Sequence, residues 1–142
     1  MSTTRTATTR WEGSLAEGTG QVTMASSGIG TFEVTWPSRA EEPQGRTSPE
    51  ELIAAAHSAC FSMALSAGLG RAGTPPTSLD TRAEVTFVPG TGITGIHLTV
   101  AGVVEGISAD DFAAAAEAAK AGCPVSQALT GTTITLSAVL AG

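Results

Sequence analysis

The chain has 142 residues, of which 42% are apolar and 14% charged, with 17 glycines and no tyrosine. This length and composition predict one globular domain with a modest core, spanning residues 1–142, and exclude a disordered chain. Seven basic residues stand against thirteen acidic ones, giving a formal net charge of −6. The basic residues form no cluster, which argues against a nucleic acid or an anionic membrane as partner.

The first third of the chain predicts an antiparallel meander. Residues 6–15, 20–26 and 30–36 are rich in Thr, Val, Phe and Trp, and glycine-containing turn sequences separate them. The polar segment 38–47 is expected to be an irregular loop.

A long helix is predicted from Ser48 to the glycines at 70–73. Ser48 suits the cap, Pro49 the first helical position, and Glu51 completes a capping box. The uncharged stretch 52–70 has nearly the length of a membrane span. Its Ala, Ser and Gly content is weakly hydrophobic, so we expect a buried or dimer-interface helix instead.

The second half of the chain predicts a hairpin, two helices and a last strand. Residues 79–88 and 93–105 alternate apolar and polar side chains around a glycine-rich turn. Ser108 is expected to cap a helix to Ala121, a short helix should run from Cys123 to about Leu129, and residues 132–140 should form a strand. The order β-β-β-α-β-β-α-α-β predicts an α+β domain.

The two cysteines occupy different settings. Cys60 lies within the long apolar helix and is expected to be sequestered in an apolar site, where a cysteine is often only a small filler. Cys123 lies between Gly122 and Pro124 at a helix start, where unpaired N–H groups favour a thiolate, although it could equally serve as a weak cap. The pair suggests one thiol that attacks a substrate and a second that resolves the product. The first residues lack the apolar stretch of a signal peptide, so we expect a cytoplasmic location, where permanent disulfides are rare.

Charged residues near the start of the long helix could tune Cys60. Arg39 and Arg46 flank the preceding loop, and a guanidinium near a buried thiol favours the thiolate. Glu50 precedes Cys60 by ten residues, which is about 15 Å of helical rise. If Glu50 acts at this thiol, either the helix is broken or the carboxylate comes from a partner subunit, and the apolar composition favours a dimer.

The histidines leave two further interpretations open. His57 lies one turn before Cys60, so a cysteine–histidine hydrolase is conceivable, although no orienting acid is legible. His97 lies in a predicted strand and is expected to be a surface or pairing residue. A zinc site would use the same residues, but their spacing lacks a paired C-x-x-C or H-x-x-x-H signature.

Two motifs resemble a known family. The sequences SPEELIAAAHSACFSMAL at 48–65 and AKAGCPVSQAL at 119–129 are similar to those of the osmotically inducible protein C (OsmC) and organic hydroperoxide resistance (Ohr) family of thiol peroxidases. The likeness also covers RWEG at 10–13 and TPPTSLDT at 74–81. It implies an intertwined homodimer with long central helices and active sites at the interface.

The resemblance assigns roles to four residues. It implies that Cys60 is the peroxidatic cysteine, Cys123 the resolving cysteine and Glu50 the helix-start glutamate. Arg39 matches the arginine of the OsmC branch, while the Gly-Gly-Arg-like segment of the Ohr branch is absent. Two other residues remain weaker candidates for the arginine: Arg46 and Arg10.

The implied reaction is the reduction of an organic hydroperoxide to an alcohol. A Cys60 thiolate stabilised by Arg39, itself held by Glu50, would become a sulfenic acid, and Cys123 would convert it into a disulfide that a dithiol or other thiol reductant opens. No metal, flavin or haem is expected. Four apolar residues would favour an alkyl or aryl peroxide: Leu52, Ile53, Phe61 and Met63. A redox sensor or a small-molecule binding module of the same fold, without efficient turnover, is the alternative.

Overall fold

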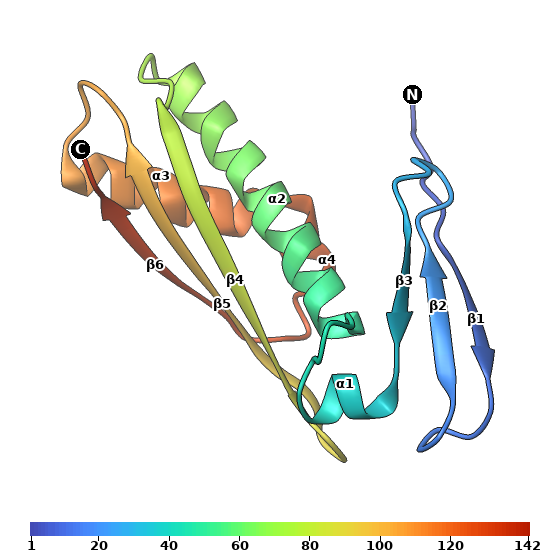
Figure 1. Ribbon diagram of the computed structural model, residues 1–142. Helices are drawn as coiled ribbons and strands as arrows, with labels where there is room; N and C mark the ends of the chain where they lie inside the picture. Colours follow the sequence, from blue (N-terminus) through green and yellow to red (C-terminus); the bar gives the residue numbers. More distant parts are fainter. The chain divides into compact units, whose positions relative to one another are not determined.

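A three-stranded antiparallel sheet lies within the first 52 residues. The computed structural model describes residues 1–142, which form two compact units, Met1–Leu52 and Ile53–Gly142 (Figure 1). In the first unit the strands pair in the order β1-β2-β3. Their bounds are β1 Thr8–Glu12, β2 Thr19–Thr23 and β3 Thr31–Val34. The predicted meander is confirmed, with shorter strands than expected. The chain is thus divided into two compact units, and the single domain over residues 1–142 stays a prediction.

A short helix, α1 (Trp36–Ala40), replaces the end of the predicted third strand and the start of the predicted loop. The Thr35 hydroxyl oxygen accepts a hydrogen bond from the Ser38 N–H, and the Ser38 hydroxyl oxygen accepts one from the Thr35 N–H, both at 3.0 Å. This reciprocal cap starts the helix, and Pro37 suits its first turn. The usual capping box ends in Glu or Gln, so a Thr and Ser version carried no clear signal in the sequence.

The long helix α2 (Pro49–Arg71) begins and ends where the sequence predicts. The Ser48 hydroxyl accepts a hydrogen bond from the Glu51 N–H at 3.1 Å. The second half of the expected capping box is not formed, because the Glu51 carboxylate accepts from the Thr47 hydroxyl instead, at 2.6 Å. Gly73, with a φ of +87°, follows the end of the helix.

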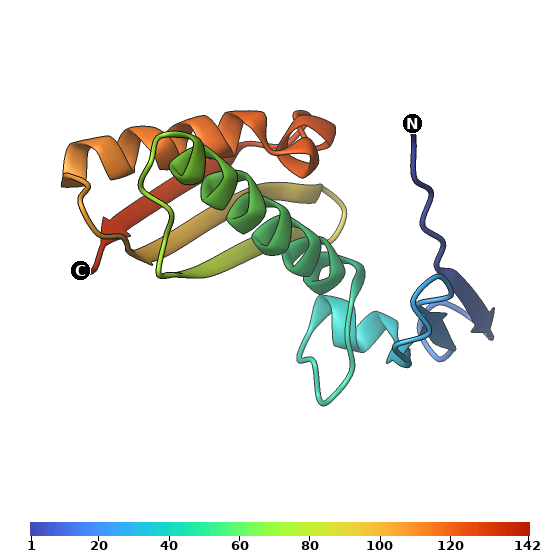
Figure 2. The same cartoon turned by 90° about the horizontal axis from the view of Figure 1, so that it is seen from above.

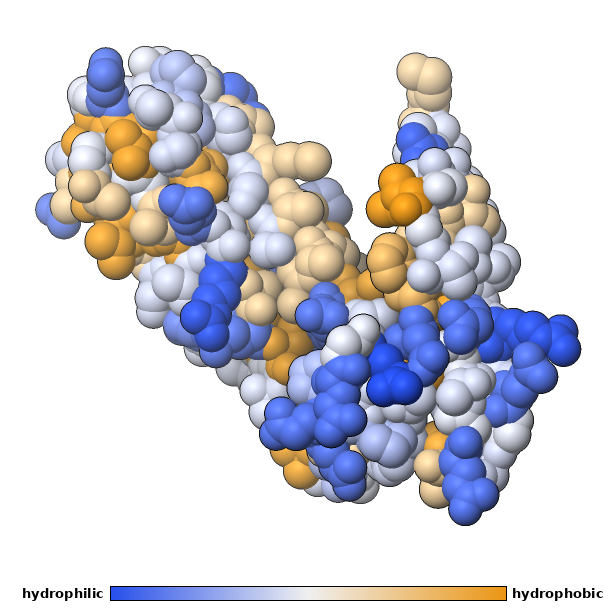
Figure 3. All heavy atoms as spheres, viewed as in Figure 1, coloured by the Kyte–Doolittle hydropathy of each residue, from blue (hydrophilic) through white to orange (hydrophobic).

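Helix α2 is buried along one face only. Beyond Glu50 in the first turn, its buried residues recur every four positions: His57, Phe61, Leu65 and Leu69. The exposed face carries a stripe of small and apolar residues: Ala55, Ala59, Met63, Ala67 and Gly70. Pale orange atoms follow α2 in Figure 3. By length and composition alone this helix could cross a membrane, since an 18-residue window has a mean hydropathy of 1.5, but one such helix is weak evidence.

The second unit is a three-stranded sheet with helices on one face. Strands β4 (Ser78–Val88) and β5 (Gly92–Val103) form the predicted antiparallel hairpin, and β6 (Ile134–Leu140) lies parallel to β5. A parallel neighbour needs a crossover, which α3 (Ala109–Gly122) and α4 (Pro124–Ala128) supply. Helices α2 and α3 cover the same face of this sheet (Figure 2).

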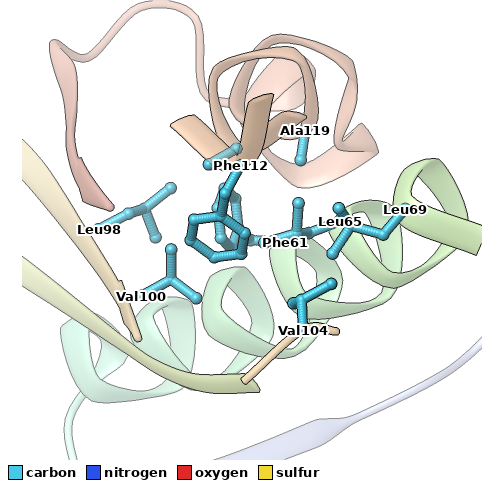
Figure 4. Packing of buried hydrophobic residues seen from close by; sticks show 9 residues of the cluster. Phe61, Leu65, Leu69, Leu98, Val100, Val104, Phe112 and Ala119 are labelled. Carbon is cyan, nitrogen blue, oxygen red and sulfur yellow. The ribbon is translucent and has the colours of Figure 1, made fainter. Parts of the chain in front are cut away.

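The core of this unit lies between the sheet and the two long helices. Phe61 from α2 and Phe112 from α3 meet Leu98 and Val100 from β5 (Figure 4). The α+β fold is therefore as predicted, with α1 as the added element.

Gly102 of β5 leaves room for the Phe112 ring. A Cβ atom at residue 102 would lie 2.6 Å from two Phe112 ring carbons, whereas one at Gly95 of the same strand would lie 3.7 Å from its nearest neighbour. We therefore expect Gly102→Ala to lower the free energy of unfolding by about 1–3 kcal/mol in urea denaturation. Gly95→Ala is the control, and equal effects of the two variants would contradict this packing.

Candidate active site

The two cysteines meet between α2 and α4. Cys60 lies in the fourth turn of α2, and Cys123 is the residue that precedes α4. Their sulfur atoms lie 2.8 Å apart, and both are free cysteines. Cys60 is half-buried, whereas Cys123 is 0% exposed. The expectation that Cys60 is the sequestered thiol is therefore wrong. Helix α2 buries the face next to Cys60, whereas Cys123, at the junction of α3 and α4, is the enclosed thiol.

The two thiols differ in acidity. Burial raises the pKa of Cys60, and the hydrogen bond with Cys123 raises it further, against a smaller lowering by the Val125 N–H. Burial also raises the pKa of Cys123, but hydrogen bonding from Cys60, from Ser126 and from the Val125 N–H outweighs it, so the net pKa is lowered. The Cys123 side chain forms no capping hydrogen bond at the start of α4. We therefore take the backbone N–H groups there to lower the pKa of Cys123 mainly through their aligned dipoles.

The two pKa shifts decide which of the two sulfurs loses its proton first. Geometry alone allows the Cys123 thiol to donate to Cys60. The order of the pKa values instead places the last proton on Cys60, which then donates to a Cys123 thiolate. We adopt the second assignment, because the surroundings of Cys123 are richer in hydrogen-bond donors.

A second pair of side chains joins the same two helices. The Nε2 atom of His57 lies 2.7 Å from the Ser126 hydroxyl oxygen, and both residues are buried. His57 therefore pairs with Ser126, and the cysteine–histidine hydrolase has no general base at Cys60. No motif in the sequence marks Ser126 as a partner of His57. Its only signal was spacing, since Ser126 follows Cys123 by three residues as His57 precedes Cys60 by three.

Arg39 and Glu50 form a forked ion pair in the first unit. The Arg39 Nε donates to both Glu50 carboxylate oxygens at 3.0 and 3.1 Å, and Nη2 donates to Oε2 at 2.9 Å. Glu50 is buried, while the Arg39 side chain is 32% exposed. Helix α1 carries Arg39 and the first turn of α2 carries Glu50. Helix α1, which the sequence did not predict, therefore positions one half of this pair.

The two weaker arginine candidates have other partners. Arg46 Nε donates to the Glu33 carboxylate. Arg10 Nε donates to Glu12 at 3.1 Å, and both of these side chains are exposed. Neither arginine has the buried carboxylate that orients Arg39.

The thiol pair belongs to the second unit and the ion pair to the first. Helix α2 is unbroken from Glu50 to Cys60, so the alternative of a broken helix is excluded. His97, the other histidine, lies in β5 and contacts the hydroxyl oxygens of Thr135 and Ser137 on β6, as expected for a pairing residue.

His57 makes stability depend on pH. Burial lowers the pKa of His57, so the unfolded chain binds more protons than the folded chain below the ordinary histidine pKa of about 6.5. We expect the free energy of unfolding to fall between about pH 7 and pH 5.5, with a shallower slope in His57→Gln. His97→Gln is the matched control, and a His57→Gln slope equal to the wild-type slope would contradict the assignment.

Three comparisons place the chain among known proteins. The family model described as OsmC-like protein matches residues 42–137. Peroxiredoxin OsmC of Escherichia coli K12 is 48% identical over 122 residues, covering 84% of this chain and 85% of that protein. Among solved structures, the organic hydroperoxide resistance protein OhrB of Bacillus subtilis has a TM-score of 0.68 at 25% identity and covers 94% of this chain and 97% of its own.

A more distant structure shows the fold alone. The OsmC-like protein of Mycoplasma pneumoniae has a TM-score of 0.76 at 12% identity, with 100% of both chains covered. The family predicted from the two cysteine motifs is confirmed: the chain belongs to the OsmC-like proteins.

Proposed function

We propose that this protein reduces organic hydroperoxides, with Cys60 as the attacking thiol and Cys123 as the resolving thiol. The chain is a thiol peroxidase, a class that its 48% identity to a protein named Peroxiredoxin OsmC supports. The observation that carries the finer proposal is the thiol pair itself. The half-buried Cys60 is accessible to a substrate, and its sulfur lies 2.8 Å from that of the fully buried Cys123.

The first step oxidises Cys60. Its thiolate attacks the terminal oxygen of ROOH, an S–O bond forms as the O–O bond breaks, and the RO⁻ group takes up a proton to leave as an alcohol. Cys60 is then a sulfenic acid, and the peroxide has been reduced by two electrons.

The second and third steps restore the dithiol. The Cys123 thiolate attacks the Cys60 sulfur, and the hydroxide that leaves takes up a proton to become water. A dithiol, or two equivalents of a simple thiol, then reduces the disulfide by exchange and is itself oxidised to a disulfide. The chemistry requires no metal, flavin or haem.

Arg39 supplies the positive charge that the Cys60 thiolate lacks in its own unit. The surroundings of Cys60 in the second unit raise its pKa, so an attacking thiolate requires a cation beside it. Arg39 is held by a buried carboxylate through three N–H···O contacts, a geometry that fixes the plane of the guanidinium. We assign Arg39 to the thiolate and to the leaving oxygen, and Glu50 to the orientation of Arg39.

Apolar residues near the start of α2 favour an organic substrate over hydrogen peroxide. Leu52 and Ile53 are half-buried, and Met63 is 73% exposed. Phe61 is fully buried in the core, so we do not include it among the residues available to a substrate.

A second subunit completes the site in this proposal. Glu50 and Cys60 are ten residues apart on one continuous helix, so Glu50 and its own Cys60 are separated by about 15 Å of rise. The exposed apolar stripe on α2 provides a surface that a second copy can cover. We therefore assign the Arg39–Glu50 pair to the Cys60 of the partner subunit in a homodimer. A cytoplasmic location, where thiol reductants are abundant, stays a prediction.

Substitutions of the two cysteines should affect the reaction at different steps. We expect Cys60→Ser to abolish the reduction of cumene hydroperoxide, while Cys123→Ser consumes a first equivalent of peroxide but forms no intramolecular disulfide. Stopped-flow measurements with cumene hydroperoxide and hydrogen peroxide should show faster oxidation by the organic peroxide. Slow oxidation that no thiol reverses would instead favour a redox sensor or a binding module.

The arginines can be distinguished by conservative substitutions. Arg39→Lys keeps the charge but loses the fork to Glu50, so we expect kcat/KM for cumene hydroperoxide to fall at least about tenfold. Arg46→Lys, next to Glu33, is the matched control and should retain the wild-type value. Loss of activity in Arg46→Lys with retention in Arg39→Lys would reverse the assignment.

Mixed dimers test whether the site is shared. Co-refolding Arg39→Ala chains with Cys60→Ser chains creates heterodimers in which one site has both residues intact if the partner supplies Arg39. We expect this mixture to regain about a quarter of the wild-type activity, because half of the dimers are mixed and each carries one good site. A monomer in sedimentation, or a mixture as inactive as its components, would contradict a shared site.

A further inference from the structure

The contacts between α2 and α4 form two parallel rungs. Cys60 faces Cys123 at 2.8 Å, and His57 faces Ser126 at 2.7 Å. On α2, His57 lies three positions, about one turn, before Cys60. On the other segment, Ser126 lies three positions, again about one turn, after Cys123. The proposed chemistry uses the first rung and leaves the second without a role.

The hydrogen bonds of His57 identify its tautomer. The ring is fully buried, and Nδ1 has no hydrogen-bond partner. Burial lowers the pKa of His57, so the ring is neutral and carries one proton. A buried N–H without an acceptor is rarer in proteins than an unpaired acceptor, which places the proton on Nε2, where it is donated to the Ser126 oxygen.

This tautomer sets the direction of the Ser126 hydroxyl. An oxygen that accepts from His57 has its own proton left to donate. Cys123 lies one turn before Ser126 on the same segment, and hydrogen bonding by the Ser126 side chain contributes to the lowered pKa of the Cys123 thiol. The structure shows the first link of a relay, from His57 Nε2–H to Ser126 Oγ at 2.7 Å; we infer the second link, from the Ser126 hydroxyl to the Cys123 sulfur, from their one-turn spacing.

We propose that His57 and Ser126 are positioning residues that stabilise the thiolate of Cys123 in the two steps in which Cys60 carries no charge. This inference rests on the proposed function. In the resolving step Cys123 attacks as a thiolate, and in the recycling step it leaves as one. Because a better-stabilised thiolate leaves faster, the relay also determines which sulfur the reductant attacks.

The recycling step then has a defined direction. A reductant thiolate RS⁻ attacks the Cys60 sulfur, an S–S bond forms between them, and the Cys60–Cys123 bond breaks with the electron pair on Cys123. A second thiolate attacks the sulfur of the first reductant molecule, which releases Cys60 as a thiolate and RSSR as the oxidised product. Exposure favours the same direction, since Cys60 is half-buried and Cys123 fully buried.

The relay is tested by titrating Cys123 without any peroxide. In a Cys60→Ser background, where Cys123 is the sole thiol, thiolate absorbance in the ultraviolet reports its pKa directly. We expect Ser126→Ala to lower the thiolate fraction about tenfold at a pH below that pKa, because one charge-assisted hydrogen bond is lost. Ser137→Ala, which removes the hydroxyl that contacts His97 on β6, is the matched control and should change nothing.

Variants of His57 separate a relay from simple packing. His57→Gln keeps an N–H near the position of Nε2 and should preserve most of the Cys123 thiolate fraction, whereas His57→Leu should lower it as Ser126→Ala does. A thiolate fraction unchanged by both Ser126→Ala and His57→Leu, in proteins shown to be folded by circular dichroism, would overturn the proposal. This titration is informative even if the protein reduces no peroxide.

The direction of recycling is tested by trapping. The wild-type disulfide, formed with diamide, is treated briefly with glutathione, and the released thiol is blocked with N-ethylmaleimide before mass spectrometry. We expect glutathione on Cys60 and maleimide on Cys123. The reverse pattern would overturn the assigned direction, whereas failure to turn over cumene hydroperoxide would overturn only the proposed function.

Discussion

The single contact between the sulfurs of Cys60 and Cys123 is the constraint on which the chemistry depends. It requires the start of α4 to return to the fourth turn of α2 after the chain has formed the β4–β5 hairpin and α3. The core formed by Phe61, Phe112 and the β5 residues keeps α2 and α3 on one face of the sheet. Stability and redox chemistry therefore depend on the same packing, because a shift of α3 would also move Cys123.

The two sulfurs are 2.8 Å apart, so once one of them is ionised the other can donate its proton to it. In our proposal, the sulfur that carries the charge differs from step to step. The second unit by itself favours the charge on Cys123. In our proposal, Arg39 reverses this preference when a peroxide is to be attacked, and Ser126 with His57 restores it when the disulfide forms or opens. Each of the two thiolates is thus stabilised by its own side chains in our proposal, Cys60 by Arg39 and Cys123 by Ser126 with His57.

Much of the fold was predictable because its signals are local. The cap of α2, the alternation in β4 and β5, and the glycine at the end of α3 each depend on a few neighbouring residues. Helix α1 was missed because its capping pair, Thr35 and Ser38, departs from the usual signature. The parallel pairing of β6 depends on contacts between residues far apart in the chain, which no local pattern encodes.

The candidate site was predictable in its residue types but not in its burial. The uncharged stretch 52–70 indicated a buried or dimer-interface helix, but not that Cys60 lies at the edge of its buried face while Cys123 is enclosed. Ser126 was not recognisable as a partner of His57, since they are 69 positions apart. Mass spectrometry after one equivalent of cumene hydroperoxide tests the central claim most directly. We expect wild-type protein to lose two hydrogen atoms and Cys123→Ser to gain one oxygen on Cys60, whereas oxidation that proceeds equally in Cys60→Ser would contradict it.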